Sequence, residues 1–508
     1  MLSVFFLPEM CNNWNILRNF AHANENDIEQ TEYDISIMRR LFLTIIATLM
    51  AFGYSWAGDY ERYYQNLPTK VTPVTTFSLP ENQVSLTDFG GIGDGVTLNT
   101  EAFRKAISAL QKKGGGRLIV PNGVWLTGPI SLKDSIDLHL ERNAIIYFSP
   151  DKRLYVPEDG EKNRALPCIR ASKRKNIAIT GEGIIDGNGS LWRPVKRSKQ
   201  SDVEWKQYLA MGGMVAEEGS LWYPWQMTNG YPDIADTPQL QENMRNDLLR
   251  LTDCVNVLLQ DVTFQNAPRF HVHPCNCRNV IVDGITVRCP WNAQNGDGID
   301  FSDVNVGLIV GCTVDVGDDG ICMKSSAAKP ASPANGCEDI MVEGNTVYHA
   351  HGGFVLGSNT TSGIRRMVVR HNRFSGTDTG LRFKSAVGRG GKTEQLFISD
   401  IVMSDITGEA IIFQCDYADR PAGEVKRNAP KKEVKANHVP DFQDIHIRNI
   451  VCRGCKTGIK ASGIEGMNSV HDIDIQDCSI VYRQNDMIVD EATAHLSTRN
   501  VVFTKDKK

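Results

Sequence analysis

The sequence predicts an all-β fold, a right-handed parallel β-helix with a short N-terminal capping helix, and two observations support this prediction. Short alternating apolar segments recur along most of the 508 residues at a nearly constant spacing. Each segment ends at a glycine or a small polar residue, the residue types that favour tight turns. A repeat of this length indicates a solenoid, because units too short to bury their own apolar face must stack on their neighbours.

The composition is that of a globular protein and argues against several other classes. Hydrophobic residues make up 41% of the chain and charged residues 23%, so a mainly disordered protein is not expected. The 55 basic and 60 acidic residues nearly balance, so we expect no nucleic-acid partner. The 44 glycines follow no collagen period and therefore indicate many turns.

The first 57 residues are expected to lie outside the mature fold. Met38-Arg39-Arg40, the apolar run 41–52 and Ser55-Trp56-Ala57 have the order of a secretory signal peptide, which we place at 38–57. The run is too short for a typical membrane-spanning helix, with an uncleaved anchor as the alternative. Residues 1–37 carry five acidic residues between 25 and 34, where a signal peptide is basic or neutral. We therefore predict that Met38 is the true start, that 1–37 is not part of the native protein, and that the protein is exported.

One helix is predicted close to the start of the mature chain. Thr100 is a suitable N-cap, and 114–116, three glycines, would end the helix. The apolar stripe between them consists of Ala102, Ala106, Ile107 and Leu110. We expect this helix to cover the open N-terminal end of the core, since solenoids need a cap. Residues 58–83 are expected to form an N-terminal extension, and 84–508 a single β-helix domain.

From residue 130 onward the repeated units are strand-like. The segments 256–261 and 279–284 (Asn-Val-Leu-Leu-Gln-Asp and Asn-Val-Ile-Val-Asp-Gly) are typical. A propeller would need four strands per blade and a longer period, so stacked parallel coils are favoured. Most steps between predicted turns are 23 to 33 residues long, and one step of 49 contains an insertion; the turns fall at 261, 284, 311, 344, 371, 400, 449 and 477.

Two segments interrupt the period, one near 192–250 and one near 416–443. The second carries a cluster of basic residues. Insertions in solenoids emerge as loops, often on the binding face, although a packed subdomain is the alternative for the first and a solvated loop for the second. The first is rich in aromatic residues: Trp192, Trp205, Tyr208, Trp222, Tyr223 and Trp225.

The cysteines do not indicate a disulfide scaffold or a metal centre. Twelve of the 13 follow residue 57, a density far below that of disulfide-rich domains. Many stand in apolar segments and are expected to be small buried side chains. Cys452 and Cys455 form a single CxxC without a second pair at metal spacing, so no zinc site is expected.

Four polar motifs stand at nearly the same point of successive units. Equivalent positions in stacked parallel coils lie about 4.8 Å apart, so we expect the motifs to meet on one outer face. Each motif alone has an ordinary explanation as a turn or a structural histidine, but the four together indicate a site. They are Asn295-Gly296-Asp297-Gly298-Ile299-Asp300, Gly317-Asp318-Asp319-Gly320, His349-Ala350-His351-Gly352-Gly353 and Arg382-Phe383-Lys384.

Three carboxylates, an imidazole and two cations suit the hydrolysis of an acidic sugar. One carboxylic acid protonates the leaving oxygen, and another carboxylate activates water or attacks the sugar. Crowding of Asp297, Asp318 and Asp319 should raise the pKa of at least one of them. Arg382 and Lys384 lie two residues apart, share a strand face and can hold a carboxylate.

Two further expectations concern the local backbone at these motifs. Asp318 and Asp319 would point to opposite sides of a regular strand, so a local irregularity is needed to bring both to the site. A calcium loop starting at Asn295 is not expected, because Ile299 and Val306 occupy its fifth and twelfth positions, which need oxygen ligands.

With these motifs the chain resembles glycoside hydrolase family 28, the polygalacturonases and their relatives. The segment 88–95, with 114–116 and 121–123, resembles the opening coil of the family, and the likeness covers roughly 84–490. The family patterns Asn-Thr-Asp, Asp-Asp, Gly-His-Gly and Arg-Ile-Lys match 295–297, 318–319, 350–352 and 382–384. The departures Gly296, Ala350 and Phe383 are spacer residues. Gly388-Arg389-Gly390-Gly391 resembles bacterial and plant-like members.

The resemblance implies inverting hydrolysis of α-1,4-galacturonosyl bonds in polygalacturonate or pectin. It implies that Asp318 is the general acid and that Asp297 and Asp319 hold and deprotonate the attacking water. It also implies that His351 orients Asp318 or tunes its acidity. It also implies four substrate-binding residues, of which the first two hold the galacturonate carboxylate on the leaving side: Arg382, Lys384, Asn295 and Tyr417. No metal or other cofactor is implied. The expected partner is a pectic polysaccharide or oligogalacturonide, met in the periplasm or medium of a bacterium.

Other functions compatible with the repeated strand-like units are a rhamnogalacturonan hydrolase, a pectate lyase or a non-catalytic carbohydrate-binding β-helix. A rhamnogalacturonan-type relative would usually lack the histidine and Arg-Lys motifs, and a lyase would carry acidic calcium ligands. The insertions 192–250 and 416–443 predict action from chain ends. An open groove accepts the middle of a polymer, and closing one end of it needs extra chain.

Overall fold

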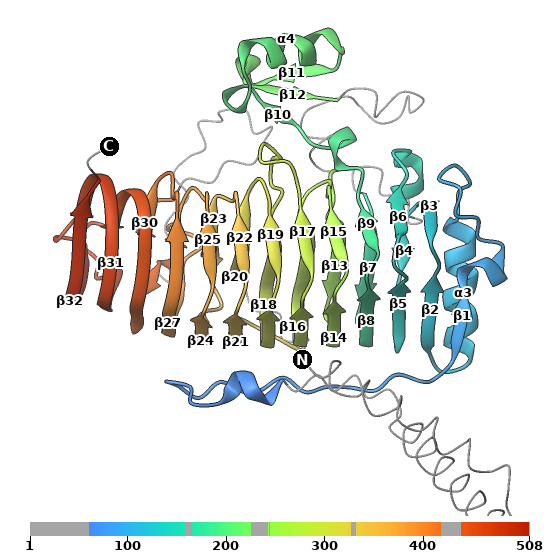
Figure 1. Cartoon of the computed structure of the whole chain (residues 1–508), viewed down its shortest axis with the longest axis horizontal. Helices are drawn as coiled ribbons and strands as arrows, with labels where there is room; N and C mark the ends of the chain where they lie inside the picture. Colours follow the sequence, from blue (N-terminus) through green and yellow to red (C-terminus); the bar gives the residue numbers. More distant parts are fainter. Residues whose placement is uncertain are drawn as a thin grey trace, which may run out of the picture. The chain divides into compact units, whose positions relative to one another are not determined.

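Successive coils of the chain hydrogen-bond to one another in parallel, and this pairing builds the architecture (Figure 1). The computed structural model describes residues 60–157, 165–224, 242, 244–326, 332–417 and 438–506. Its 29-stranded sheet winds into coils whose strands pair in three rows, so the predicted parallel β-helix is confirmed. Residues from Gly58 to Lys508 form one compact unit.

The first row carries the site. It contains β4 (Ile130–Ser131), β7 (Ile169–Ser172), β13 (Leu249–Thr252), the first halves of β16 (Val272–Asp283) and β18 (Ile299–Val310), then β20 (Asp319–Ser325), β23 (Gly352–Thr360), β26 (Leu381–Lys384), β28 (Glu409–Gln414) and the ends of β30 (Ile445–Ser462) and β31 (Val470–Val489).

The second row contains β1 (Gln83–Ser85), β2 (Gly116–Val120), β5 (Ile136–Leu140), β8 (Lys175–Gly181), β14 (Val255–Gln260), the second halves of β16 and β18, then β21 (Cys337–Glu343), β24 (Ile364–Arg370), β27 (Lys392–Ser404), the starts of β30 and β31, and β32 (Ala494–Lys505).

The third row contains β3 (Gly123–Thr127), β6 (Ala144–Phe148), β9 (Ile184–Asp186), β15 (Thr263–Gln265), β17 (Thr286–Arg288), β19 (Thr313–Asp315), β22 (Thr346–Tyr348), β25 (Arg373–Ser375) and the end of β27. The short β29 (Asp441–Phe442) pairs with β27 and β31.

Apolar side chains from all three rows fill the interior of the coils. Alternation along each strand sends every second side chain inward, and parallel stacking lines up equivalent side chains of neighbouring coils. Phe383 of β26 and Phe413 of β28 stack with ring centroids 4.3 Å apart and planes 6° apart. Both rings are fully buried. The register that stacks the core also stacks the polar outer positions that form the site.

The predicted turn positions all adopt the left-handed backbone conformation. The residues at 261, 284, 311, 344, 371, 400, 449 and 477 have φ between 53° and 70°. They are Gly, Asp, Asn and His, the residues that adopt positive φ at least cost. The first five directly follow a strand of the second row, whereas Asp400, Asn449 and Asp477 lie inside β27, β30 and β31, where these long strands leave the second row. In both cases the repeat recognised in the sequence corresponds to the same corner of the coil.

The predicted helix is α3 (Thr100–Lys112), and it covers the N-terminal end of the core. Its apolar stripe is buried and belongs to the same core cluster as the first coils. The predicted N-cap is wrong by one residue: Asn99 is the cap, and Thr100 is the first helical residue. The Thr100 hydroxyl instead accepts a hydrogen bond from the Gly128 backbone N–H at 2.7 Å.

The first insertion contains a small packed subdomain between β9 and β13 (Figure 1). Strands β10 (Val195–Lys196), β12 (Leu221–Tyr223) and β11 (Met214–Ala216) form an antiparallel sheet. Helix α4 (Asp202–Ala210) begins with a Ser201–Glu204 capping box. Tyr208 of this helix packs on Trp222, with ring centroids 5.0 Å apart.

Several sequence predictions lie outside the described residues: the segment 1–37, the signal peptide 38–57, Trp225, and the basic cluster of the second insertion. The twelve described cysteines are buried, as predicted for most of them, and no two of these twelve form a disulfide. No helix in the described part of the chain is both long and apolar enough to cross a membrane.

Candidate active site

Three of the four polar motifs meet at the entrance to the first row of strands. Asp297 comes just before β18, Asp319 begins β20, and His351 comes just before β23. The Gly298 N–H donates to the Asp319 carbonyl at 2.9 Å, and the His351 N–H donates to the Asp318 carbonyl at 2.8 Å. The motifs are therefore neighbours on consecutive coils, although they span more than fifty positions of the sequence.

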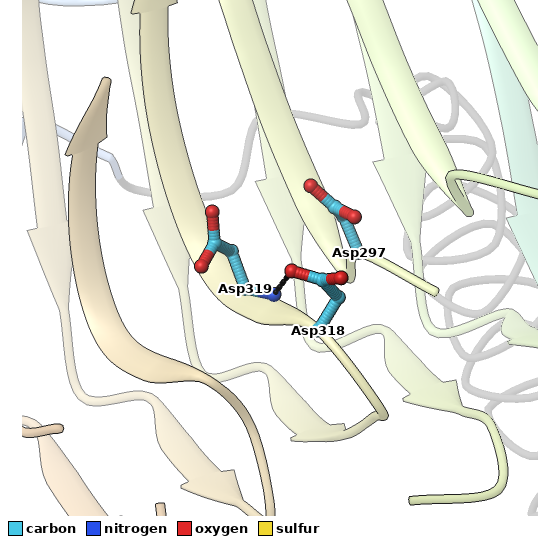
Figure 2. Close-up of side chains that lie close together, drawn as sticks. All are labelled: Asp297, Asp318 and Asp319. Atoms are coloured by element: carbon cyan, nitrogen blue, oxygen red, sulfur yellow. Dashed lines mark hydrogen bonds between the residues drawn. The ribbon is translucent and has the colours of Figure 1, made fainter. Parts of the chain in front are cut away.

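The three carboxyl groups lie side by side (Figure 2). Asp297, Asp318 and Asp319 each offer an oxygen within 4.8 Å of the others. Asp318 lies in a bend before β20, and its Oδ1 accepts the Asp319 backbone N–H at 3.0 Å. This bend is the irregularity that lets adjacent residues face one site. Asp297 and Asp319 are buried, whereas the Asp318 side chain is 15% exposed.

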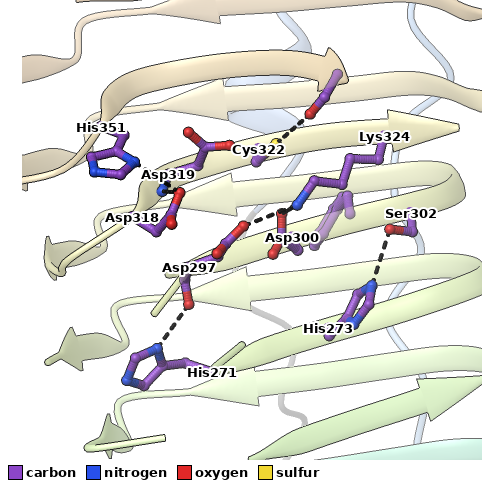
Figure 3. A network of polar contacts seen from close by, with 12 residues as sticks. His271, His273, Asp297, Asp300, Ser302, Asp318, Asp319, Cys322, Lys324 and His351 are labelled. Atoms are coloured by element: carbon purple, nitrogen blue, oxygen red, sulfur yellow. Dashed lines mark hydrogen bonds and ion pairs between the residues drawn. The ribbon is translucent and has the colours of Figure 1, made fainter. Parts of the chain in front are cut away.

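Two lysines hold the two buried carboxylates. The Lys324 ammonium lies 3.0 Å from Asp297 Oδ2 and 2.6 Å from Asp300 Oδ1 (Figure 3). The Lys384 ammonium lies 2.7 Å from Asp319 Oδ2. A buried carboxylate without such a partner would be costly. The second oxygens, Asp297 Oδ1 and Asp319 Oδ1, are buried and accept no hydrogen bond from the described residues.

The surroundings drive the protonation of the three carboxyl groups apart. Burial raises the pKa of Asp297 well above its usual range, and the charges of Asp300, Asp318 and Asp319 add to this effect against Lys324. Burial would also raise the pKa of Asp318, but His351, Lys384 and Lys199 together lower it. Burial acts the same way on Asp319, where Lys384 and Arg382 lower the pKa. The expected effect of crowding is present, and it falls on Asp297.

The predicted carboxylate clamp lies next to the acids, with its two cations differently engaged. Lys384 is buried and committed to Asp319. Arg382 is partly exposed; its Nη1 lies 3.5 Å from the His351 carbonyl and 3.9 Å from Asp319 Oδ1. Tyr417 stands over both cations, with its ring centroid 5.4 Å from the Arg382 guanidinium and 4.9 Å from the Lys384 ammonium. Arg382 is thus the more exposed of the two cations, whereas Lys384 lines the cavity described below.

Asn295 is held by a buried arginine that the sequence had not pointed to. Arg245 Nη2 donates to Asn295 Oδ1 at 2.9 Å, and Arg245 Nη1 donates to the Gln294 carbonyl at 2.7 Å. Arg245 also forms an ion pair with Glu242. This arrangement holds the loop that leads to Asp297 and engages Asn295 Oδ1 with a buried side chain of the protein.

Most of these residues line one cavity of about 730 Å³. Cationic side chains lie on both sides of the acids: Lys384 on one, and Arg250 and Arg269 on the other. Arg250 is held by the buried Asp247, with Nη1 2.9 Å from Oδ2. Such a cavity can accept a chain that carries carboxylates on both sides of the reacting bond.

Sequence reasoning missed Lys324, Lys199 and Arg245. Lys324 did carry a signal, since it is a charged residue that directly follows the apolar residues 321–323 of β20. Lys199 and Arg245 belong to the non-periodic first insertion, where spacing says nothing about contacts.

Comparison with known proteins agrees with this geometry. The chain is 28% identical over 415 residues to an exo-poly-alpha-D-galacturonosidase of Dickeya chrysanthemi, covering 78% of this chain and 66% of that relative. It is 28% identical over 345 residues to a probable polygalacturonase of Vitis vinifera, covering 65% and 62%. The matched part therefore spans less than two thirds of each relative.

Solved structures share the fold. An exopolygalacturonase from Thermotoga maritima is 27% identical with a TM-score of 0.66, over 88% of this chain and 96% of that one. A family 28 exopolygalacturonase from Yersinia enterocolitica is 21% identical with a TM-score of 0.58, over 84% and 79%. Residues 204–498, which carry all four polar motifs, match the profile described as Glycosyl hydrolases family 28. The chain belongs to this family.

Proposed function

We propose that the protein hydrolyses α-1,4-galacturonosyl bonds of polygalacturonate or pectin and that it acts from chain ends. The observation that carries this proposal is the cavity itself: three carboxyl groups lie within 4.8 Å of one another, beside a partly exposed arginine and a tyrosine. Carboxyl pairs catalyse glycoside hydrolysis, and a guanidinium grips a carboxylate in two places.

In the proposed reaction Asp318 donates a proton to the leaving oxygen. It is the most exposed of the three acids and hydrogen-bonds to His351 Nδ1 at 3.1 Å. In the same proposal Asp297 and Asp319 bind the attacking water through Oδ1, the oxygen that accepts no hydrogen bond from the described residues. One of them accepts the proton of the water while the other holds its second hydrogen.

Inversion of the anomeric carbon follows from the use of two carboxylates on one water. Inverting glycosidases usually keep the carboxyl groups about 6.5–9.5 Å apart, a longer separation than the 4.8 Å within which these oxygens lie. Inversion is therefore proposed because Asp297 and Asp319 would hold a water that attacks the sugar directly, and not because of the distance between the carboxyl groups. Proton NMR of the first product decides it, because inversion of an α-bond yields the β-anomer.

Action from chain ends is supported by two features. The relatives from Dickeya and Thermotoga are named as exo-acting. The first insertion also enters this site, since Lys196 lines the cavity and the Lys199 ammonium lies 3.3 Å from His351 Nε2. We further propose that residues 38–57 direct export, which brings the enzyme to pectic substrates outside the cytoplasm.

One assay tests the proposal. The protein is incubated with polygalacturonate and a chelator, and reducing ends, unsaturated products and viscosity are followed. New reducing ends without unsaturated products are expected, with mono- or disaccharides released early. Unsaturated products would mean a lyase, and no cleavage of polygalacturonate would mean another substrate or a binding protein. A steep fall in viscosity with mid-length oligomers would contradict end action alone.

A further inference from the structure

The first insertion places one cation directly on the catalytic histidine of the proposed mechanism. Lys199 ends the short helix η8 (Arg197–Lys199) beside α4, far from the polar motifs in sequence. Its ammonium lies 3.3 Å from the Nε2 atom of His351, across 152 positions of the chain.

The three N–H groups of this ammonium have three acceptors. Besides His351 Nε2, they reach the carbonyl oxygens of Gly317 at 3.2 Å and Trp291 at 3.3 Å. The ammonium also lies 5.8 Å from the ring centroid of Trp291, within range of a cation–π contact. Gly317 directly precedes Asp318, so Lys199 ties together the histidine and the backbone that leads to the proposed general acid.

A lysine ammonium has only donors, so an imidazole nitrogen that bonds to it must be the acceptor. With Lys199 as the donor, His351 Nε2 would carry no hydrogen, and the single ring hydrogen would lie on Nδ1, which is 3.1 Å from Asp318 Oδ1. We infer that Lys199 is a positioning residue that keeps His351 neutral, as the Nδ1–H tautomer that donates to Asp318. The tautomer is inferred from geometry alone, and only the expected effect on catalysis rests on the proposed function.

The catalytic meaning concerns the proton of Asp318. A positively charged imidazole beside this carboxyl favours its ionised form, which is a poor general acid. Among the groups that lower the pKa of Asp318, His351 comes first after the opposing effect of burial, and Lys199 comes later. A neutral ring removes the effect of the imidazolium charge, while the hydrogen bond from Nδ1, which itself lowers the pKa of Asp318, still orients this carboxyl group.

The other charged groups around His351 do not replace Lys199. Asp378, which is largely exposed, lies 3.8 Å from Nε2 through Oδ2, too far for a hydrogen bond. Arg382 approaches the backbone carbonyl of His351 and not its ring. Asp318 faces Nδ1. Lys199 is thus the described group within hydrogen-bond distance of Nε2.

The insertion holds Lys199 in place through the residues on either side. Arg197 Nη1 donates to the Gln200 carbonyl at 2.7 Å, and the Arg197 N–H donates to the Ser220 carbonyl at 2.8 Å. The Ser201–Glu204 capping box starts α4 immediately afterwards. The packed subdomain therefore positions the Lys199 side chain in the site.

The decisive measurement is the ¹⁵N NMR spectrum of the His351 ring in the full chain at neutral pH, without substrate. Its signal is assigned by its loss in His351→Gln. We expect a hydrogen on Nδ1 and none on Nε2 in the wild type. In Lys199→Met we expect exchange between tautomers or a doubly protonated ring. A wild-type ring with a hydrogen on Nε2, or unchanged ring nitrogens in Lys199→Met, would overturn the inference.

Kinetics on the cleaved substrate give a second readout. Lys199→Met should lower kcat about tenfold or more, since a misplaced catalytic group costs up to roughly 10²-fold, and should change KM little. Lys199→Arg keeps the charge and donors and should recover part of kcat. Lys206→Met, the same change at an exposed position of α4, is the control and should leave kcat unaltered. Loss of kcat in the control would point to the fold of the insertion instead.

The two kinds of failure can be told apart. The spectrum needs no substrate, so it tests the tautomer even if the protein cleaves something other than polygalacturonate. If Lys199→Met does not fold, the wild-type spectrum alone still supports or overturns the inference.

Discussion

Every acidic side chain of the site has a basic partner, and the partner decides what the acid can do. Lys324 and Lys384 hold the buried Asp297 and Asp319, whereas Asp318 bonds to an imidazole. An ammonium beside a carboxylate favours its ionised form, and an imidazole N–H that donates to a carboxyl group orients it and also favours the ionised form. The neighbours thus separate two buried, lysine-paired carboxyl groups from a third that bonds to an imidazole.

Asp318→Asn should abolish turnover without loss of folding. Removal of general acid catalysis costs roughly 10² to 10⁴ in rate. Substrate binding should persist, because Arg382 and Tyr417 lie on other coils. Turnover and binding of polygalacturonate to the variant are compared with those of the wild type. A variant that retains more than about a tenth of the wild-type kcat would refute the acid assignment.

Arg382→Ala and Lys384→Ala should fail in different ways. Arg382 is partly exposed, so its loss should raise KM for polygalacturonate by roughly tenfold to a hundredfold, the value of a charged hydrogen bond of about 1.5–3 kcal/mol. The increase should shrink on methyl-esterified substrate, which lacks the charge. Lys384 is buried on Asp319, so its loss should act mainly on kcat. Equal losses for Arg382→Ala on both substrates would exclude the clamp.

His273 should make stability depend on pH. Burial would lower the pKa of His273, but Cys275 and Asp247 raise it to about 9 from its ordinary value of 6.5. Its Nδ1 lies 2.7 Å from the buried Asp247 Oδ2. A raised pKa adds stability that is complete below pH 6.5 and is lost as pH rises through about 9. The free energy of unfolding should fall over this window by at most about 3 kcal/mol.

Denaturant unfolding at several pH values measures this change. His273→Gln should remove the dependence of the unfolding free energy on pH between these values. His446 is a partly exposed histidine of the second row, and His446→Gln should leave this dependence unchanged. A flat wild-type curve would show that His273 does not carry the charge.

At the scale of elements, the corners of the coils are held by buried amides as well as by turn residues. Asn372 Oδ1 accepts the Asn345 N–H and side-chain amide at 2.9 and 3.0 Å, and its Nδ2 donates to the Val342 and Arg370 carbonyls. Asn345 in turn accepts the Cys312 N–H at 2.9 Å. Backbone groups that no strand can satisfy at a corner therefore find partners in the neighbouring coil.

Asn372→Leu should reduce the free energy of unfolding by several kcal/mol. The change removes the acceptor of two buried N–H groups and the donor to two carbonyls, and each buried group left unsatisfied costs about 1–3 kcal/mol. Chemical denaturation measures the loss, with the exposed Asn485→Leu as the matched control. Equal effects at both positions would mean that the corner network adds nothing to stability.

At the scale of the whole molecule, the segment 60–75 binds several coils together. The Tyr60 hydroxyl donates to Asp283 Oδ2 at 2.9 Å, the Thr72 hydroxyl donates to Asp339 Oδ2 at 3.0 Å, and the Tyr63 carbonyl accepts from Arg370 Nη2 at 3.2 Å. These partners belong to β16, β21 and β24, in the second row of strands. The segment runs along these coils (Figure 1), and its contacts lie outside the row that carries the acids.

Tyr60→Phe should therefore lower stability and leave turnover unchanged. Tyr60 is buried, and a hydrogen bond to a charged acceptor contributes about 1.5–3 kcal/mol; Gln260 also bonds to Asp283, so the lower end is expected. Thermal unfolding and kcat are measured together. Tyr63→Phe removes a hydroxyl whose bond to Arg62 is exposed and should be silent. A fall in kcat with Tyr60→Phe would contradict the separation of this segment from the site.

Much of this molecule could be predicted from the sequence because its order is local and repeated. A residue that tolerates positive φ must follow each strand of the second row, so positions such as Asp261 and Gly284 revealed the coils. Parallel stacking then requires equivalent positions to be neighbours, so the sequence alone predicts that Asp297, Asp318, Asp319 and His351 lie close together.

Only the tertiary structure decided which groups pair. The sequence predicts Lys384 as a cation that binds substrate, whereas in the structure it is buried and paired with Asp319. This pairing depends on how the strands of neighbouring coils are spaced and aligned. Lys199 reaches His351 because a non-periodic insertion folds into its own sheet and helix and packs beside the coils. Periodicity carries no information about such a contact, since the partners are joined by side-chain reach and not by a repeat. The acids were therefore predictable from the sequence, and their protonation depends on the fold.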